Sequence, residues 1–198
     1  MIAAELDAVT IDAYGTLMTL VDPLPALQTL LPDYDRTAIE HAFRTEAAYY
    51  AGHVGEGRDA ASLARLHETC VAVFNDTLGS SLSAAEYVGA LHFAVLPGTL
   101  EALERLRALG LTLAVVGNWD YSLHRWLAEH GLAQVFATVV SAAGKPDPAG
   151  ILQALDVMRV PPARALHIGD DGADEQAARA AGVHFARAPL PDAVAGLT

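Results

Sequence analysis

The chain has 198 residues, of which 53% are hydrophobic, and its formal net charge is −12. This apolar content is sufficient for one large domain or for a core domain with an insertion. The acidic charge disfavours nucleic acids and anionic membranes as partners, whereas a small phosphorylated molecule stays compatible, because a local cation or a metal can overrule the average field.

The amino-terminal residues and the cysteine content bear on location. Residues 1–7 contain neither a basic start nor an apolar signal core, and the longest apolar stretch, residues 108–117, is too short to cross a bilayer. Cys70 is the only cysteine, so no intramolecular disulfide can form, which suits a reducing compartment. We therefore expect a cytoplasmic protein without a membrane-spanning segment.

The first predicted strand, residues 8–11, is followed by a long segment of helical character. No strand pattern persists between residues 18 and 93, and helical runs are predicted over residues 37–51, 59–78 and 84–92. We therefore expect residues 18–92 to form a helical module inserted directly after the first strand.

From residue 97 onward, predicted strands alternate with predicted helices. The strands are 111–116, 135–140, 165–168 and 183–186, and the helices are 99–109, 121–130, 148–157 and 173–181. This alternation is typical of a parallel sheet with right-handed crossovers. The predicted fold class is α/β, with a parallel-sheet core made of residues 1–17 and 93–198.

Polar side chains follow the first two predicted core strands, at the edge where open α/β sheets bind ligands. Asp12 comes directly after residues 8–11 and before a glycine turn. A carboxylate there can be a covalent nucleophile, a metal ligand or both, or it can cap the next helix. Asn118 follows residues 111–116. Its amide can hold a substrate oxygen, or it can belong to a helix cap.

Charged side chains follow the next two strands. Lys145 is followed by two prolines that fix the backbone at a helix start, so we expect its ammonium to be held in place. It can neutralise a carboxylate and a phosphoryl oxygen, or it can be a surface lysine at a turn. Asp170, Asp171 and Asp174 follow residues 165–168. Clustered carboxylates are unfavourable unless a cation neutralises them, and oxygen-only ligands indicate Mg²⁺.

The order of these motifs resembles that of the haloacid dehalogenase-like (HAD) hydrolase superfamily, over nearly the whole chain. Residues 12–17 are similar to its first motif, Asn118 lies in the second, residues 145–148 are similar to the third, and residues 169–174 to the fourth. Each motif alone is weak, but four in order at predicted strand ends are specific. The resemblance implies a Rossmann-like core with a helical cap domain inserted after the first motif.

The resemblance also implies catalytic roles. Asp12 would attack the substrate and form an aspartyl intermediate. Asn118 and Lys145 would orient and stabilise the transferred group, and Thr16 of the first motif would help to bind the substrate. The catalytic candidates are therefore Asp12 and Lys145, together with Tyr14 of the first motif.

The implied metal is Mg²⁺. The resemblance places it on Asp12, on the backbone carbonyl of Tyr14 and on Asp170, with Asp174 or Asp171 in support. Such a cation reduces the repulsion between an anionic nucleophile and an anionic phosphate.

Three positions depart from the family pattern. Tyr14 stands where family phosphatases usually carry a second aspartate as general acid and base, and a phenol is a poor base at neutral pH. Asp120 is an alternative acid and base, or a helix cap. Gly117 replaces the expected serine or threonine, which removes a phosphate-binding hydroxyl. Asp174 comes one residue earlier than in many relatives, so Glu175 is an alternative.

A tyrosine at position 14 is also similar to the 2-haloacid dehalogenase branch, which needs no metal. Phe43, Arg44 and Tyr49 resemble the arginine helix that binds the substrate carboxylate and halide in that branch. Arg44 can equally be a solvated helix residue. The retained Asp170 favours a metal and phosphate chemistry.

We therefore expect a Mg²⁺-dependent phosphomonoester hydrolase that acts through Asp12 on a small metabolite, with the cap closing over the active site. A metal-free 2-haloacid dehalogenase and a catalytically impaired binding or regulatory protein are the alternatives. The expected partner is a small, phosphorylated molecule, and the protein is expected to be a monomer or a homodimer. The eight histidines show no metal-ligand spacing, and most of them are expected at the surface or as satisfied core residues.

Overall fold

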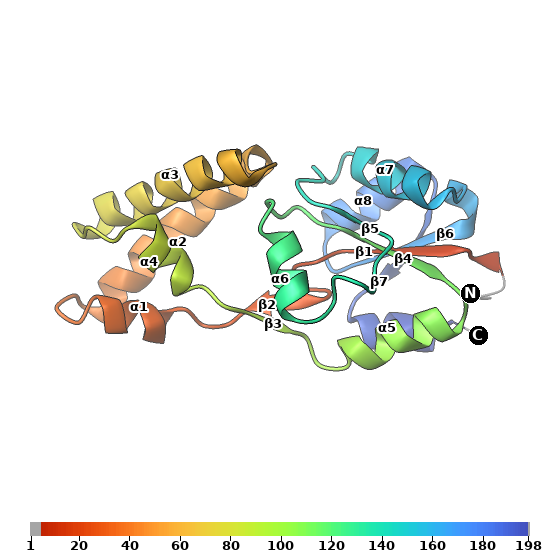
Figure 1. Ribbon diagram of the computed structural model, residues 1–198, viewed down its shortest axis with the longest axis horizontal. Coiled ribbons are helices and arrows are strands. Elements are labelled where there is room, and N and C mark those ends of the chain that lie inside the picture. The colour runs from red at the N-terminus through yellow and green to blue at the C-terminus, as the bar shows by residue number, and fades with distance from the viewer. Residues whose placement is uncertain (1–4, 198) are drawn as a thin grey trace. The chain divides into compact units, whose positions relative to one another are not determined.

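The computed structural model describes residues 5–197. Contacts divide the chain into two compact units, one comprising Met1–Thr19 and Val95–Thr198 and the other Leu20–Ala94. We call them the core unit and the helical unit (Figure 1). Within the described residues, no helix is both long enough and apolar enough to cross a membrane.

The core unit is built on a five-stranded parallel sheet with the strand order β5-β4-β1-β6-β7. All four residues of β1 are buried, and β1 is hydrogen-bonded to β4 on one side and to β6 on the other. The strands are β1 (Ala8–Ile11), β4 (Thr112–Val116), β5 (Thr138–Val140), β6 (Ala165–Gly169) and β7 (His184–Arg187). This topology confirms the predicted α/β class with a Rossmann-like core.

Helices cover both faces of the sheet (Figure 1). Helices α7 and α8 pack against each other and against the sheet, and α5 packs against α9. The core-unit helices are α5 (Thr99–Ala108), α6 (Leu123–Glu129), α7 (Ala149–Met158), α8 (Gly172–Ala181) and α9 (Leu190–Ala195), with a short 3-10 helix η3 at Pro162–Arg164. Apolar residues of α7, such as Ile151, and of α8, such as Ala177, join Ala8 and Val116 in one buried cluster.

The helical unit has its own hydrophobic core. Phe74 and Tyr87 lie at its centre with ring centroids 4.8 Å apart, among buried residues that include Leu27 and Ile39. Polar caps at the helix starts fix the element boundaries, as at Asp59, whose carboxylate accepts a hydrogen bond from Ser62 N. The elements are α1 (Leu24–Leu30), α2 (Arg36–His53), η2 (Val54–Glu56), α3 (Ala60–Leu78) and α4 (Ala84–Gly89).

The structure corrects several sequence-based expectations about elements. Strands β2 (Met18–Leu20) and β3 (Phe93–Val95) pair as a two-stranded sheet, although the sequence predicts no strand between residues 18 and 93. Each has only three residues, too few to show a period of two. Helices α1 and α9 were not predicted either, because both are short and carry a proline in the first turn.

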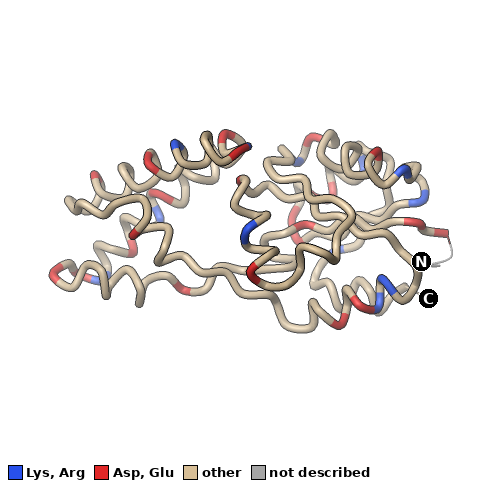
Figure 2. The backbone as a smooth tube through the Cα atoms, in the orientation of Figure 1, with Lys and Arg blue, Asp and Glu red and all other residues tan. Residues whose placement is uncertain are grey.

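Acidic residues dominate the charge of both units. The chain contains 24 aspartates and glutamates against 12 lysines and arginines. Figure 2 shows both kinds distributed along the backbone of each unit. A cluster of carboxylates therefore counts as a candidate site only where its members are buried and converge.

Candidate active site

Four loops meet at the carboxyl edge of the parallel sheet. Asp12 follows β1, Asn118 follows β4, Lys145 follows β5 and Asp170 follows β6. The parallel register of these strands places their carboxyl ends side by side, and Asp12 N donates a hydrogen bond to Ile168 O of β6 at 2.8 Å. The structure thus brings the four predicted motifs to one edge.

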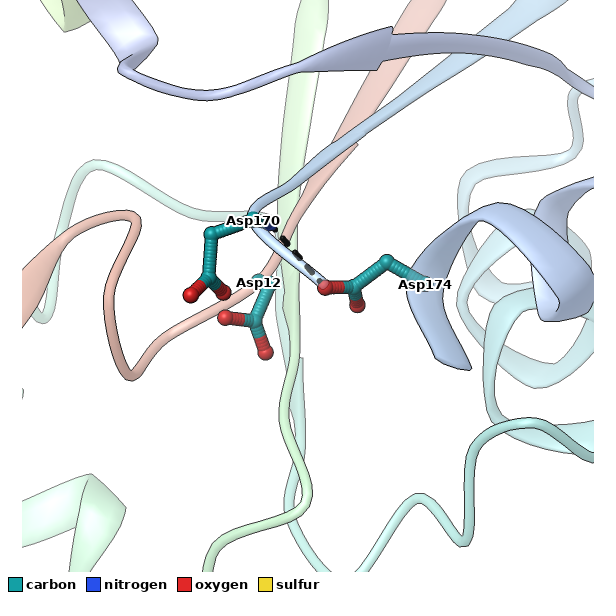
Figure 3. Close-up of side chains that lie close together, drawn as sticks. All are labelled: Asp12, Asp170 and Asp174. Atoms are coloured by element: carbon teal, nitrogen blue, oxygen red, sulfur yellow. Dashed lines mark hydrogen bonds between the residues drawn. The ribbon is translucent and has the colours of Figure 1, made fainter. Parts of the chain in front are cut away.

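Three carboxylates converge at this edge. One carboxylate oxygen from each of Asp12, Asp170 and Asp174 lies within 4.8 Å of the others. Figure 3 shows Asp12 and Asp170 on neighbouring strand ends, with Asp174 reaching the cluster from helix α8. Asp12 and Asp174 are 6% and 1% exposed, whereas Asp170 is exposed. The cluster is therefore open to solvent on the Asp170 side.

Two glycines make this close approach possible. A Cβ atom on Gly15 would lie 2.4 Å from Asp170 Oδ2, and Gly15 has a φ of +82°. A Cβ atom on Gly169 would lie 2.2 Å from Asp174 Cγ. Both positions therefore require glycine for the carboxylates to occupy these places.

Lys145 lies between two of the carboxylates. Its Nζ donates hydrogen bonds to Asp12 Oδ1 and Asp174 Oδ1, each at 2.5 Å, and the residue is 7% exposed. Burial disfavours the ammonium, but Asp12 and Asp174 outweigh this effect and raise the pKa of Lys145. The lysine is therefore a permanent positive charge at the site.

Asn118 holds the loop that carries this lysine. Its side-chain Nδ2 donates to Lys145 O and its Oδ1 accepts from Lys145 N, both at 2.8 Å. The amide that was predicted to hold a substrate oxygen thus pairs with the main chain of the catalytic candidate Lys145. One amide hydrogen of Asn118 remains outside this pair.

His167 joins the site, although no motif pointed to it. It lies on β6, is fully buried, and its Nε2 lies 3.1 Å from Asp174 Oδ1. Its Nδ1 lies 2.8 Å from Thr10 Oγ1, in register on the neighbouring strand β1. His167 agrees with the expectation that most histidines are surface or satisfied core residues. Its contact with the acidic cluster was not expected from the sequence.

The electrostatics of the cluster fit a divalent cation. Burial raises the pKa of Asp12 to about 7, although Lys145 opposes the shift and Asp174 adds to it. Burial and the charge of Asp174 also raise the pKa of Asp170. Burial acts the same way on Asp174, but hydrogen bonds from His167 and Lys145 outweigh it and hold its pKa below the usual range. One ammonium does not balance three carboxylates, and their all-oxygen donor set suits Mg²⁺.

The acids of the fourth motif divide into separate tasks. Asp174 Oδ2 accepts hydrogen bonds from the backbone N–H groups of Asp170 and Asp171, so both of its oxygens are engaged by the protein. Asp171 is the N-cap of α8. Glu175, the alternative to Asp174, pairs with Arg187 at 3.0 Å and is not in the cluster. Asp170 is thus the acid of this motif best placed to accept a ligand.

The remaining first-motif candidates have contrasting environments. Tyr14 is 53% exposed, and its ring makes an edge contact with Trp119 at 6.2 Å between centroids. Thr16 is buried, and its Oγ1 has no hydrogen-bond partner among the described residues. The Thr16 hydroxyl therefore does not face bulk solvent.

The second-motif departures have local explanations. A Cβ atom on Gly117 would lie 3.1 Å from the Cβ of Ala13, so Gly117 allows the loops after β1 and β4 to pack closely. Asp120 Oδ1 accepts a hydrogen bond from Ser122 N, the N-cap residue of α6, so Asp120 stabilises the turn before this helix and is not its N-cap. Arg44 belongs to the helical unit, where it is exposed on α2.

Comparisons with known proteins define the class. The family model of the haloacid dehalogenase-like hydrolases matches residues 6–182, and the chain therefore belongs to this hydrolase family, as its motif order predicts. It is 31% identical over 192 residues to a phosphoglycolate phosphatase of Thiobacillus denitrificans, covering 89% of this chain and 80% of that one.

Two further relatives extend the comparison. The haloacid dehalogenase-like hydrolase domain-containing protein 3 of Xenopus laevis is 36% identical over 104 residues, which cover 50% of this chain and 43% of that protein. The chain thus spans less than half the length of such relatives. The solved structure of the L-2-haloacid dehalogenase of Xanthobacter autotrophicus has a TM-score of 0.68 and 26% identity, covering 92% of this chain and 77% of that one.

Proposed function

We propose that this protein is a Mg²⁺-dependent phosphomonoester hydrolase that acts on a small metabolite through Asp12. The observation that carries the proposal is the buried Asp12–Lys145 pair beside Asp170 and Asp174. Relatives named phosphoglycolate phosphatases, which align over most of the chain, support a phosphate ester as the substrate.

In the proposed reaction, an Asp12 carboxylate oxygen attacks phosphorus while the bond from phosphorus to the leaving oxygen breaks. The substrate alcohol departs, and water then cleaves the aspartyl phosphate to release inorganic phosphate and restore Asp12. Lys145 holds one oxygen of Asp12 and supplies positive charge beside the transferred group. The buried position of Asp12 keeps bulk water away from the nucleophile.

Mg²⁺ fits the donor set at this edge. Asp12, Asp170 and the backbone carbonyl of Tyr14 would hold it, with Asp174 in support, and it would supply the charge that lets two anions approach each other. Because both oxygens of Asp174 accept hydrogen bonds from the protein, Asp174 would support the metal through a water molecule.

Substrate binding and proton transfer are also part of the proposal. Asn118 would orient the phosphate through its second amide hydrogen and through the lysine loop that it holds. Thr16 is proposed to help to bind the substrate, and the exposed Tyr14 is proposed to act as the general acid for the leaving group. Residues 18–92 are proposed to act as the substrate-selecting cap, with Arg44 as the substrate contact to test.

A 2-haloacid dehalogenase is the second candidate. It is favoured by Tyr14 and by the similarity to the Xanthobacter autotrophicus enzyme. In that reaction Asp12 would attack carbon and displace halide, with no need for the charge of Asp170. The two candidate functions therefore differ in whether activity requires the charge of Asp170.

The test is phosphate release from an aryl phosphate with Mg²⁺ and with a chelator. We expect turnover that requires Mg²⁺ and is lost in Asp12→Asn. Asp156→Asn is the matched control, because Asp156 is exposed on α7. Halide release from 2-haloacids, unaffected by chelator, would replace the phosphatase with the dehalogenase. Mg²⁺ binding by calorimetry without turnover on either substrate class would favour an impaired binding protein.

A further inference from the structure

Five buried polar side chains of the core unit form one connected circuit, which the backbone between two of them closes. Thr10 of β1 contacts His167 of β6, and His167 contacts Asp174 of α8. Asp174 accepts from Lys145, and Lys145 donates to Asp12, which lies two residues beyond Thr10, directly after β1. All five residues have less than a tenth of their surface exposed. The circuit thus ties the nucleophile to two strands, a helix and the lysine loop.

The chemistry of the circuit assigns the proton positions on His167. Lys145 holds the Asp174 carboxylate in its ionised form, which only accepts hydrogen bonds, so His167 Nε2 is the donor in their contact at 3.1 Å. The ring is fully buried, and burial disfavours a charged imidazolium. In a neutral ring Nδ1 is then an acceptor, and the Thr10 hydroxyl donates to it at 2.8 Å.

Asp174 Oδ1 is shared by His167 and Lys145, while Oδ2 is held by two backbone N–H groups. Removing the His167 contact would leave the side-chain rotation of Asp174 less restrained on the side that faces Lys145. A displaced Asp174 would in turn change the direction in which Lys145 Nζ approaches Asp12. The packing role of His167 against Phe185, with ring centroids 6.4 Å apart, does not require this polar connection.

We propose that His167 is a positioning residue, which fixes Asp174 and through it the ammonium of Lys145 against Asp12, and that Thr10 selects the required tautomer. The kinetic part of this proposal rests on the proposed phosphatase function. The structural part concerns only the hydrogen bonds of Lys145 and His167, so it can be measured without turnover.

The first experiment is NMR of the full chain. The Lys145 ammonium should give a slowly exchanging signal, assigned by its loss in Lys145→Met, and His167 should show a protonated Nε2 and an unprotonated Nδ1. We expect His167→Leu to shift or remove the Lys145 signal. His167→Gln, whose amide can donate in place of Nε2, should restore it. A protonated Nδ1, or a Lys145 signal unchanged in His167→Leu, would overturn the proposal.

Thr10→Val is the milder second variant, because it removes one hydroxyl and keeps the shape of the side chain. Thr99→Val is its matched control, since Thr99 is buried in the core unit and its Oγ1 has no partner among the described residues. We expect Thr10→Val, and not Thr99→Val, to alter the His167 ring-nitrogen shifts and the Lys145 signal. Equal changes in Thr10→Val and Thr99→Val would show that the Thr10 hydroxyl has no specific effect on His167 and Lys145, which would overturn this part of the proposal.

The second experiment is steady-state kinetics on the aryl phosphate. We expect His167→Leu to lower kcat by about 10- to 100-fold with KM unchanged, and His167→Gln to recover most of it. Equal losses in both variants, or a change in KM alone, would contradict a positioning role. A wild type without turnover would remove the proposed function, while the NMR result would still decide the structural part.

Discussion

The side chain of Asn118 pairs with the main chain of Lys145 through two hydrogen bonds, each 2.8 Å long, across a sequence separation of 27 residues. The pair joins the loop after β4 to the loop after β5. Lys145 in turn contacts Asp12 after β1. Three loops of the sheet edge therefore share one hydrogen-bonded network, and the position of the ammonium depends on Asn118.

The Asn118 pair leads to a prediction about stability and activity. Asn118→Ala removes both hydrogen bonds and leaves a partly buried N–H and C=O of Lys145 without this partner. We expect a loss of about 1–3 kcal/mol in the free energy of unfolding, measured by urea denaturation with tryptophan fluorescence. We also expect kcat to fall, because Lys145 is less well held. Unchanged stability together with an increased KM would instead assign Asn118 to substrate binding alone.

Gly15 provides a test of the close approach between the first and fourth motifs. Gly15→Ala adds a Cβ that would lie 2.4 Å from Asp170 Oδ2, so we expect Asp170 to be displaced and the Mg²⁺ affinity to fall by about tenfold or more. Isothermal titration with Mg²⁺ measures the effect. Gly110→Ala is the matched control, because Gly110 has a similar φ of +79° but no atom within 4 Å of the added Cβ. If both variants bind Mg²⁺ equally well, the contact with Asp170 has no role in metal binding.

The fourth-motif acids allow a matched pair of charge removals. We expect Asp170→Asn to weaken Mg²⁺ binding by about tenfold or more. Asp171→Asn removes a neighbouring charge but keeps the cap of α8, because asparagine and aspartate cap helices equally well. We therefore expect Asp171→Asn to leave Mg²⁺ affinity and stability close to those of the wild type. Titration calorimetry compares the two, and a similar loss in both would show that only net charge matters.

A buried carboxyl in the helical unit leads to a pH-dependent stability. Glu46 accepts a hydrogen bond from Tyr87 Oη at 2.6 Å, and burial raises its pKa above 4.5. The folded chain therefore favours the protonated form. The contribution of Glu46 to the free energy of unfolding is fully present below the pKa of this residue in the unfolded chain. It is lost as pH rises through the pKa of Glu46 in the folded chain.

We therefore expect Glu46→Gln, which stays neutral, to remove part of the fall in stability as pH rises. Urea denaturation from acidic to neutral pH measures this slope. Glu40→Gln is the control, because Glu40 is exposed on the same helix α2. A slope that is identical in the wild type and in Glu46→Gln would contradict the prediction.

The sequence predicts which side chains meet at the carboxyl edge of the sheet, because the signals for this are local. Asp12, Lys145 and Asp170 each follow an apolar run, and parallel strands bring such positions together regardless of loop detail. The family resemblance adds the roles, and the family itself is confirmed. The short strands β2 and β3 escape prediction because three residues carry no periodicity.

The missed features depend on contacts between residues far apart in the chain. His167 lies inside β6, where a buried polar residue looks like any interior strand position, and its contact with Thr10 spans 157 residues. The pairing of Asn118 with Lys145 is invisible for the same reason, since neither loop reveals its distance from the other. The sequence does not decide between Asp174 and Glu175, because that decision requires the residue at which α8 begins. Consecutive residues of a helix point in directions that differ by about 100°.

The close packing of Gly117 on Ala13 has a consequence for substitutions at both positions. A Cβ at position 117 would lie 3.1 Å from the Cβ of Ala13, so a serine or threonine there requires Ala13 to shift by a few tenths of an ångström or to be replaced by glycine. We therefore expect the effects of substitutions at these two sites to be coupled. Gly117→Ser alone should lower the free energy of unfolding relative to the wild type. The double variant Gly117→Ser with Ala13→Gly should be more stable than Gly117→Ser alone.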